Sequence, residues 1–304
     1  MAKDRARKTG WSGGQGRFAA TLLLPAVLVV FGIVLYPVLR TLLTSFFEVN
    51  SVIPVETPFV GLANYIDILQ DPVFWATVGR TLYFTLVSTA LELVFGILLA
   101  LLLAAPLRAR WLFRAVVILP WALPTIVNGT MWRGILNAQY GALNALLTQV
   151  GMLEDYRSWL GTPFLALNMV MLADVWKNTS LVAFLLLAGL QTIPRDMYEA
   201  ARMDGAGALR SFFALTLPLL VPSIAVVLVL RTIEAFKVFD IIYIMTRGGP
   251  ASGTQTIAFY TYLEAFSNQR FGYGSAVAYL IVLAVAVLAA IYLRLLRRSE
   301  GSLL

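Results

Sequence analysis

Six long apolar segments alternate with shorter polar segments along this chain of 304 residues. They lie at about 18–39, 81–105, 115–136, 164–190, 217–245 and 275–293. Each is close to the ~20 residues that a helix needs to cross the hydrocarbon core of a bilayer. None alternates apolar and polar residues as the strands of a membrane β-barrel do. The pattern therefore predicts an all-α, polytopic membrane protein with six transmembrane helices in one domain over 18–298.

Basic residues gather in every second connection between these segments. One set of fourteen comprises Lys3, Arg5, Arg7, Lys8, Arg17, Arg108, Arg110, Arg114, Arg195, Arg202, Arg210, Arg294, Arg297 and Arg298. The opposite connections hold Arg80, Arg157, Arg247 and Arg270. Connections rich in Lys and Arg stay in the cytoplasm. We therefore expect cytoplasmic tails at residues 1–17 and 299–304, in a protein of the bacterial plasma (inner) membrane.

The composition excludes several kinds of site. Only 13% of the residues are charged and 60% are hydrophobic, whereas a soluble domain carries about 25% charged residues. The chain has no Cys and no His, so we expect no disulfide, no Cys/His metal site and no Ser–His or Cys–His catalytic pair. Its net charge of +7 follows from the topology. We therefore expect the lipid bilayer, and no nucleic acid, as a partner.

The fourth connection, residues 194–217, is the most polar interruption of the apolar pattern. Pro194 suits the first turn of a helix, and the dipole of that helix favours Asp196 and Glu199 near its start. Gly205 supplies a left-handed residue that ends the helix. We expect a second short helix from about Ala208 to the proline at 218. The connection therefore predicts a short, stiff helix–turn–helix on the cytoplasmic side.

Residues in this connection resemble the EAA loop of ABC importer permeases. Glu199, Ala200 and Ala201 are followed, after three residues, by Gly205, and nine residues later by the sequence LTLP. The only departure from the family pattern is Leu215 in place of Ile. Two further stretches, DVWKNTSLVAFLLLAGLQTIP and RTIEAFKVFDIIYIMTRGGP, are similar to the carbohydrate-type permeases of maltose, trehalose and glycerol-phosphate systems.

The resemblance implies the type I ABC importer permease fold and a transport function. The chain would carry a sugar, a di- or oligosaccharide, across the membrane as one half of a heterodimer with a second permease. An extracytoplasmic sugar-binding protein would deliver the cargo, and two cytoplasmic ATPase subunits would bind ATP and Mg²⁺. This chain would then bind no cofactor and would not be an enzyme. The implied ATPase-coupling residues are Glu199, Ala200, Ala201, Arg202, Asp204, Gly205 and Ala206.

Polar residues inside the apolar segments are candidates for the transport pathway, because a charge within a membrane span is costly and usually functional. The candidates are Asn128, Trp132, Asp174, Trp176, Lys177, Asn178, Arg231, Glu234, Lys237 and Asp240. The resemblance to the maltose permease adds Leu181. Asp174 and Lys177 are spaced to pair on one helix face, and residues 231, 234, 237 and 240 form a row of alternating charge.

Two interpretations of these charges stay open. They line a wet pathway for sugar hydroxyls, or they form ion pairs that hold the helices together. For Asn178 we favour contact with cargo, and for Glu92 a structural role. Three alternative functions are a glycerol-phosphate importer permease, a self-contained secondary transporter and a membrane-embedded enzyme. Neither inverted repeats nor a metal-ligand cluster appears in the sequence, which disfavours the last two.

Overall fold

The computed structural model describes residues 13–50, 57–106 and 108–300, and these form helices and connecting loops. The first long helix consists of α1, a π-helical turn and α2, at Gly13–Val29, Val30–Leu35 and Tyr36–Thr44. The next are α3 Ala63–Gln70, α4 Pro72–Ala104, α5 Arg110–Ala122, α6 Thr125–Ile135, α7 Ala142–Gln149 and α8 Pro163–Gln191. They are followed by α9 Arg195–Met203, α10 Ala208–Ser211, α11 Leu217–Phe236, α12 Asp240–Met245, α13 Ile257–Tyr262 and α14 Phe271–Glu300.

Five helices of the described chain are long and apolar enough to cross a membrane. They are Thr21–Thr44, Pro72–Ala104, Pro163–Gln191, Ala208–Phe236 and Phe271–Tyr292. A sixth span exists if α5 and α6, which meet at an angle of 92°, count as one. The first span reaches Thr44 and the second begins at Pro72, beyond the predicted segments 18–39 and 81–105, and two further differences change the architecture.

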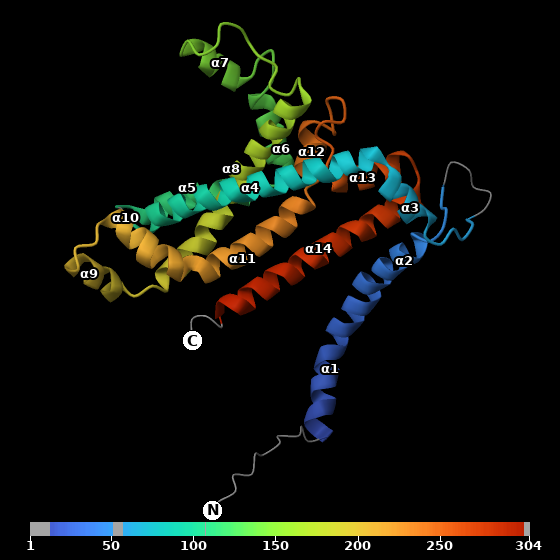
Figure 1. Ribbon diagram of the computed structural model, residues 1–304, viewed down its shortest axis with the longest axis horizontal. Helices are drawn as coiled ribbons and strands as arrows, with labels where there is room; N and C mark the ends of the chain where they lie inside the picture. Colours follow the sequence, from blue (N-terminus) through green and yellow to red (C-terminus); the bar gives the residue numbers. More distant parts are fainter. Residues whose placement is uncertain (1–12, 51–56, 107, 301–304) are drawn as a thin grey trace, which may run out of the picture.

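The first difference lies in the predicted span 115–136, which the structure divides into α5 and α6. Leu123 is extended, with ψ of 134°, and Pro124 caps α6. A residue that precedes a proline is pushed out of the helical region by the proline ring. Pro124 therefore ends α5 and lets α6 leave in a new direction, upward in Figure 1.

The second difference lies in the predicted span 217–245 and in the short helix expected before it. The helix from Ala208 continues through Pro218 as one element to Phe236, because a π-helical turn at Phe212–Thr216 accommodates the proline. The expectation that this helix stops at residue 218 is therefore wrong. The long helix ends instead at Phe236, and α12 begins separately at Asp240.

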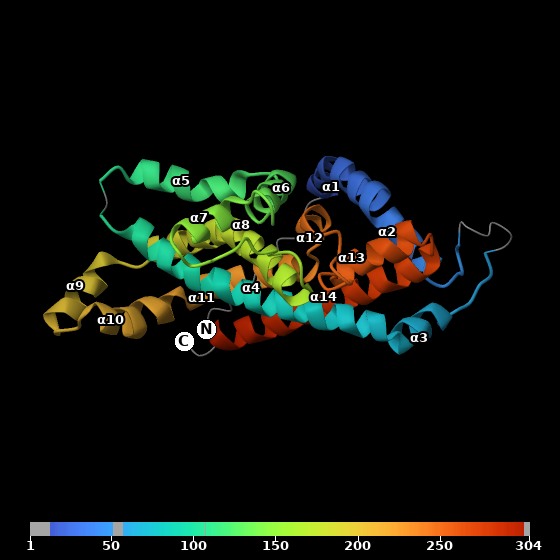
Figure 2. The same cartoon turned by 90° about the horizontal axis from the view of Figure 1, so that it is seen from above.

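Helices α4 and α8 form the central pair of the bundle. Around its middle, Phe84 of α4 packs with Val170 and Met171 of α8, and all three are buried. Gly96 lets the two helices approach closely, because a Cβ at this position would lie 2.3 Å from Cγ1 of Val182. The helices α11 and α14 pack beside this pair, as Figures 1 and 2 show.

The two ends of the bundle carry different connections. Helix α9 and the α4–α5 connection lie at the same end, and α3 lies at the opposite end (Figure 2). At the α3 end, the Asp71 carboxylate accepts hydrogen bonds from Tyr260 (2.6 Å) and Tyr273 (3.3 Å) and thereby joins α4 to α13 and α14. Burial raises the pKa of Asp71, but the hydrogen bonds to this carboxylate outweigh it and hold the pKa below its usual value.

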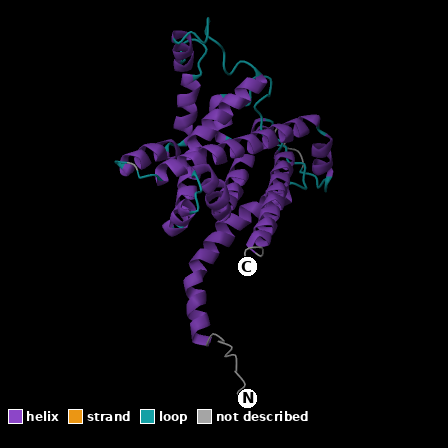
Figure 3. Ribbon diagram, turned by 60° about the vertical axis from the view of Figure 1, so that its left-hand side comes forward, coloured by secondary structure: helices purple, strands orange, loops and turns teal. Residues whose placement is uncertain are grey.

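Two parts of the chain stand away from the bundle. Helix α7 and the loop that joins it to α8 project from it (Figure 3). The first long helix also extends outward, and between Thr21 and Leu39 none of its side chains is buried. This apolar surface is available to lipid or to another subunit.

We expect Gly96→Ala to destabilise the protein by about 1–3 kcal/mol, because the added methyl group would force α4 away from Val182. The matched control is Gly79→Ala on the same helix, where a Cβ would meet nothing within 4 Å. Thermal unfolding of both variants in detergent measures the effect. Equal unfolding midpoints would contradict close packing at Gly96.

Candidate transport pathway and coupling loop

A cavity of about 600 Å³ lies between the α5–α6 bend, the middle of α8 and the C-terminal end of α11. Seven of the predicted pathway residues line it: Asp174, Lys177, Asn178, Arg231, Glu234, Lys237 and Asp240. The structure thus brings together residues from two helices that are more than fifty positions apart in the sequence. Polar groups on such a wall can exchange hydrogen bonds with a hydroxylated cargo.

Two interruptions of helical structure form the walls of this cavity. Between α11 and α12 the chain leaves the helix at Lys237, and the freed carbonyl of Val238 accepts a hydrogen bond from Thr256 (2.8 Å). At the α5–α6 bend, Thr125 reaches the cavity wall. Non-helical backbone within a membrane is tolerated only where protein or water satisfies its polar groups. The broken helices therefore mark the polar centre of the bundle.

The guanidinium of Arg231 is the centre of a buried ion cluster. It donates two hydrogen bonds to Glu92 of α4, at 2.6 and 2.9 Å, and one to Glu234 at 2.5 Å. Its Nη2 also lies 3.5 Å from Oδ2 of Asp174 on α8. The Arg231 and Glu92 side chains are 3% and 0% exposed, whereas Glu234 is 51% exposed. Arg231 therefore joins three helices, and the expected structural role of Glu92 agrees with this geometry.

We expected Asp174 to pair with Lys177, and the charges at 231, 234, 237 and 240 to pair in sequence. Of these pairs, Arg231 with Glu234 forms. Lys177 donates to Oγ1 of Thr125 (2.8 Å), and no ion pair joins it to Asp174 among the described residues, because Arg231 occupies the space beside that carboxylate. The row of charges on the fifth span also stops after Arg231 and Glu234, because the helix ends at Phe236. Lys237 and Asp240 are exposed instead on the cavity wall.

Four candidates do not line the cavity: Asn128, Trp132, Trp176 and Leu181. Asn128 is fully buried and donates to the carbonyl of Ala173 (3.3 Å), which ties α6 to α8. Trp132 and Trp176 meet edge to face, with ring centroids 5.9 Å apart. Asn128, Trp132 and Trp176 therefore make contacts between α6 and α8.

Sequence reasoning missed four residues of the cavity wall, namely Trp121, Thr125, Phe239 and Ile241. Their apolar or small polar side chains look ordinary within a membrane span. The dipeptide of Pro124 and Thr125 carried one usable signal, because a proline at this position predicts a helix boundary. Phe239 and Ile241 reach the cavity through the break after Phe236.

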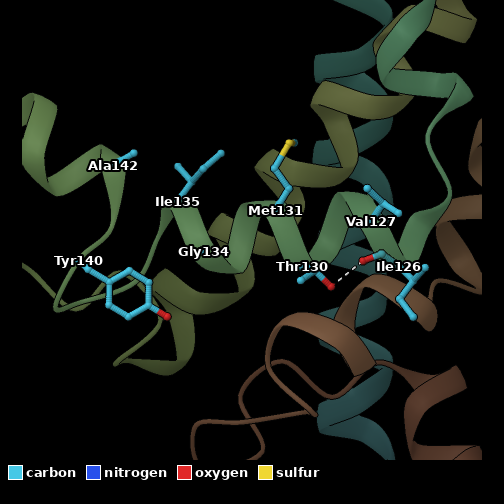
Figure 4. A pocket seen from close by; sticks show the side chains of 8 residues that line it. All are labelled: Ile126, Val127, Thr130, Met131, Gly134, Ile135, Tyr140 and Ala142. Carbon is cyan, nitrogen blue, oxygen red and sulfur yellow. Dashed lines mark hydrogen bonds between the residues drawn. The ribbon is translucent and has the colours of Figure 1, made fainter.

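A second hollow, of about 620 Å³, lies along α6 and the start of α7. Figure 4 shows its lining, which includes Ile126, Val127, Met131 and Tyr140. The hydroxyl of Thr130 is already bonded to the carbonyl of Ile126 (2.7 Å). This wall offers few polar groups, so the chemistry suited to a sugar lies in the cavity around Asn178.

The predicted coupling residues form the end of α9 and its turn. Gly205 adopts φ of 76°, in the left-handed region, and the backbone N–H of Ala206 donates to the carbonyl of Ala201 (2.9 Å). Five of the seven residues are exposed: Glu199, Ala200, Arg202, Asp204 and Gly205. Ala201 and Ala206 are half-buried. The sequence did not indicate that Tyr198 meets Oγ1 of Thr216 (3.1 Å), a contact that fixes α9 against the long helix of α10 and α11.

Residues 92–302 match the family model described as the binding-protein-dependent transport system inner membrane component. The chain belongs to this family. It is 40% identical to the sulfoquinovosyl glycerol transport system permease protein SmoG of Agrobacterium fabrum, over 98% of this chain and 96% of the relative. It is also 40% identical to the trehalose/maltose transport system permease protein MalF of Thermococcus litoralis, over 92% and 94%.

The fold matches a solved bacterial alginate ABC transporter in complex with its pentasaccharide-bound periplasmic protein. The TM-score is 0.82, with 21% identity over 94% of this chain and 96% of that one. The predicted family and the all-α permease fold are therefore confirmed. The chain is a multi-pass inner-membrane component of a transport system. Family membership also overturns the alternatives of a secondary transporter and a membrane enzyme.

We expect Glu92→Gln to destabilise the protein by about 3–5 kcal/mol, because it removes one partner of a buried ion pair. The control Glu234→Gln removes a carboxylate from the same guanidinium, but that side chain is half exposed, so its loss should cost less than about 1 kcal/mol. Denaturant titration of the purified proteins in micelles compares the two. Similar decreases in the free energy of unfolding for the two variants would show that the cluster does not depend on Glu92.

Proposed function

We propose that this chain is a permease subunit of an ABC importer for a neutral sugar, a di- or oligosaccharide. The observation that carries the proposal is the cavity around Asn178, where helix breaks in a membrane bundle bring amide and charged side chains together. Hydroxyl groups of a sugar both donate and accept hydrogen bonds, and this wall offers both kinds of partner. The relative named for trehalose/maltose transport supports a neutral disaccharide, and the relative named for sulfoquinovosyl glycerol transport supports a sugar glycoside, although its sulfonate is anionic.

The charge balance of the cavity favours a neutral cargo over glycerol phosphate. Three basic side chains face it, from Lys177, Arg231 and Lys237. Three carboxylates face it as well, from Asp174, Glu234 and Asp240. A phosphate site would present an excess of unpaired donors, whereas Arg231 is already bonded to carboxylates and Lys177 to a hydroxyl.

The proposed partners are a second permease, two cytoplasmic ATPase subunits and an extracytoplasmic sugar-binding protein. ATP and Mg²⁺ would be bound by the ATPase subunits, and this chain would bind no cofactor of its own. The basic connections support cytoplasmic termini and a cytoplasmic coupling loop. The exposed end of α9 is a suitable contact for the ATPase.

The structure suggests how movement of the ATPase reaches the cargo. One helix runs from Ala208 to Phe236, and 29 residues at 1.5 Å each give it a length of about 43 Å. Its first turns are tied to α9 by Tyr198 and Thr216, and its last turns carry Arg231 and Glu234 at the cavity. We propose that displacement of α9 tilts this helix as a rigid rod and changes access to the cavity.

We expect Asn178→Leu to weaken sugar uptake about tenfold, because it leaves a cargo hydroxyl without a partner at the wall. The matched control is Asn168→Leu on the same helix, whose amide oxygen accepts from Tyr83 and does not line the cavity. Uptake of labelled sugars by cells that express the importer measures the effect. Unchanged uptake by the Asn178 variant would assign that residue to packing.

We expect Glu199→Lys to leave membrane insertion intact and to abolish transport, because it reverses an exposed charge at the proposed ATPase contact. The tagged chain, purified in mild detergent from its host, should recover an ATPase and a second permease. The substitution should lower the amount of ATPase that is recovered and leave the amount of the second permease unchanged. Glu154→Lys, a matched reversal in the loop between α7 and α8, should change neither. Recovery of the chain alone would contradict the proposed assembly.

A further inference from the structure

A third cavity, of about 1070 Å³, lies between the α4–α5 connection and α9, at the end of the bundle that carries the coupling loop. Four arginines line it. Arg110 and Arg114 are one turn apart on α5, and Arg195 and Arg202 lie at the two ends of α9. Arg202 also belongs to the predicted coupling residues, whereas the proposed transport function gives no role to Arg110, Arg114 and Arg195.

These four guanidinium groups are not neutralised by the chain itself. Within the described residues, none of them has a carboxylate within the 4.0 Å that defines an ion pair, and Glu199 is the only acidic residue on the wall. Nε of Arg114 is buried and has no hydrogen-bond partner. The carboxylate of Glu199 balances only one of the four positive charges, so the cavity can accept a further anion.

The surroundings of the cavity fit an anion attached to lipid. Trp111 is 74% exposed beside Arg110, and Leu112, Phe113 and Val116 are also exposed on α5. Trp is enriched at the boundary between membrane and water, and exposed apolar residues next to it suit acyl chains. Within the cavity, Leu101 and Leu190 add apolar wall beside the arginines. The planar donors of arginine bind phosphate, like carboxylate, in a bidentate manner, and a phosphate attached to lipid fits the apolar surroundings.

We propose that this cavity binds the phosphodiester headgroup of an anionic phospholipid, between α5 and the coupling loop. Its position on the cytoplasmic leaflet follows from the orientation proposed above. The headgroup would offset the repulsion between the arginines of α5 and those of α9. The other end of α5 carries Trp121, which lines the cavity around Asn178. The lipid would therefore connect the coupling loop to a helix that lines that cavity.

Lipid selectivity tests the proposal without any need to know the cargo. The full chain is placed in nanodiscs of phosphatidylcholine that contain a brominated lipid, either phosphatidylglycerol or phosphatidylcholine. Brominated lipid quenches the fluorescence of a nearby Trp, so the quenching of Trp111 reports which lipid is bound beside it. The contribution of Trp111 is the difference between the wild type and Trp111→Phe. We expect a preference for phosphatidylglycerol that Arg110→Gln with Arg114→Gln lowers about thirtyfold.

Two variants separate a site from general electrostatic attraction. Arg108→Gln with Arg210→Gln removes the same charge from exposed residues outside the cavity and should keep the preference. Arg110→Lys with Arg114→Lys keeps the charge, loses the planar donors and should give an intermediate value. Equal losses in the two glutamine pairs, or no preference in the wild type, would overturn the proposal.

Two further measurements identify the source of the anion. Inorganic phosphate added to phosphatidylcholine nanodiscs should not displace brominated phosphatidylglycerol, and complete displacement would assign the site to a soluble phosphate. The importer purified with its ATPase subunits should keep the lipid preference. Loss of the preference in that complex would assign the arginines to an acidic surface of the ATPase.

Discussion

The buried guanidinium of Arg231 is the interaction on which the rest of the bundle depends. A charge placed within a membrane domain must be paired, and Arg231 meets carboxylates from α4, α8 and α11. Loss of Glu92 would leave Arg231 without its fully buried partner in a medium of low polarity, whereas Glu234 is half exposed. A single side chain therefore ties α11 to α4 and α8, and α8 and α11 also line the cavity around Asn178.

The same helix that supplies Arg231 also carries the connection to the coupling loop. Because the π-helical turn lets the chain pass Pro218 without a break, α10 and α11 form one rigid element. The contact of Tyr198 with Thr216 fixes α9 to the start of this element. In the proposed mechanism, movement at the coupling loop would be delivered to the part of the bundle where the cluster and the cavity meet.

Helix breaks provide the polar groups that continuous helices would hide. After Phe236 the chain leaves the helix, and Lys237 and Asp240 turn toward the cavity. At Pro124 the bend between α5 and α6 brings Thr125 to Lys177. The arginine cavity at the coupling end has a different character, because four arginines face a single carboxylate and form no ion pair within the described residues.

The sequence by itself determined the membrane class, the family and the set of polar residues in the spans, because each depends on local composition or on spacing along one segment. Only the tertiary structure decided which of these residues meet. Asp174 faces Arg231 from another helix rather than Lys177 from its own, and Trp132 packs on Trp176 away from the cavity. Periodicity fixes the face of a helix that a residue occupies, but the partner across that face depends on helix breaks and crossing angles that one segment does not encode.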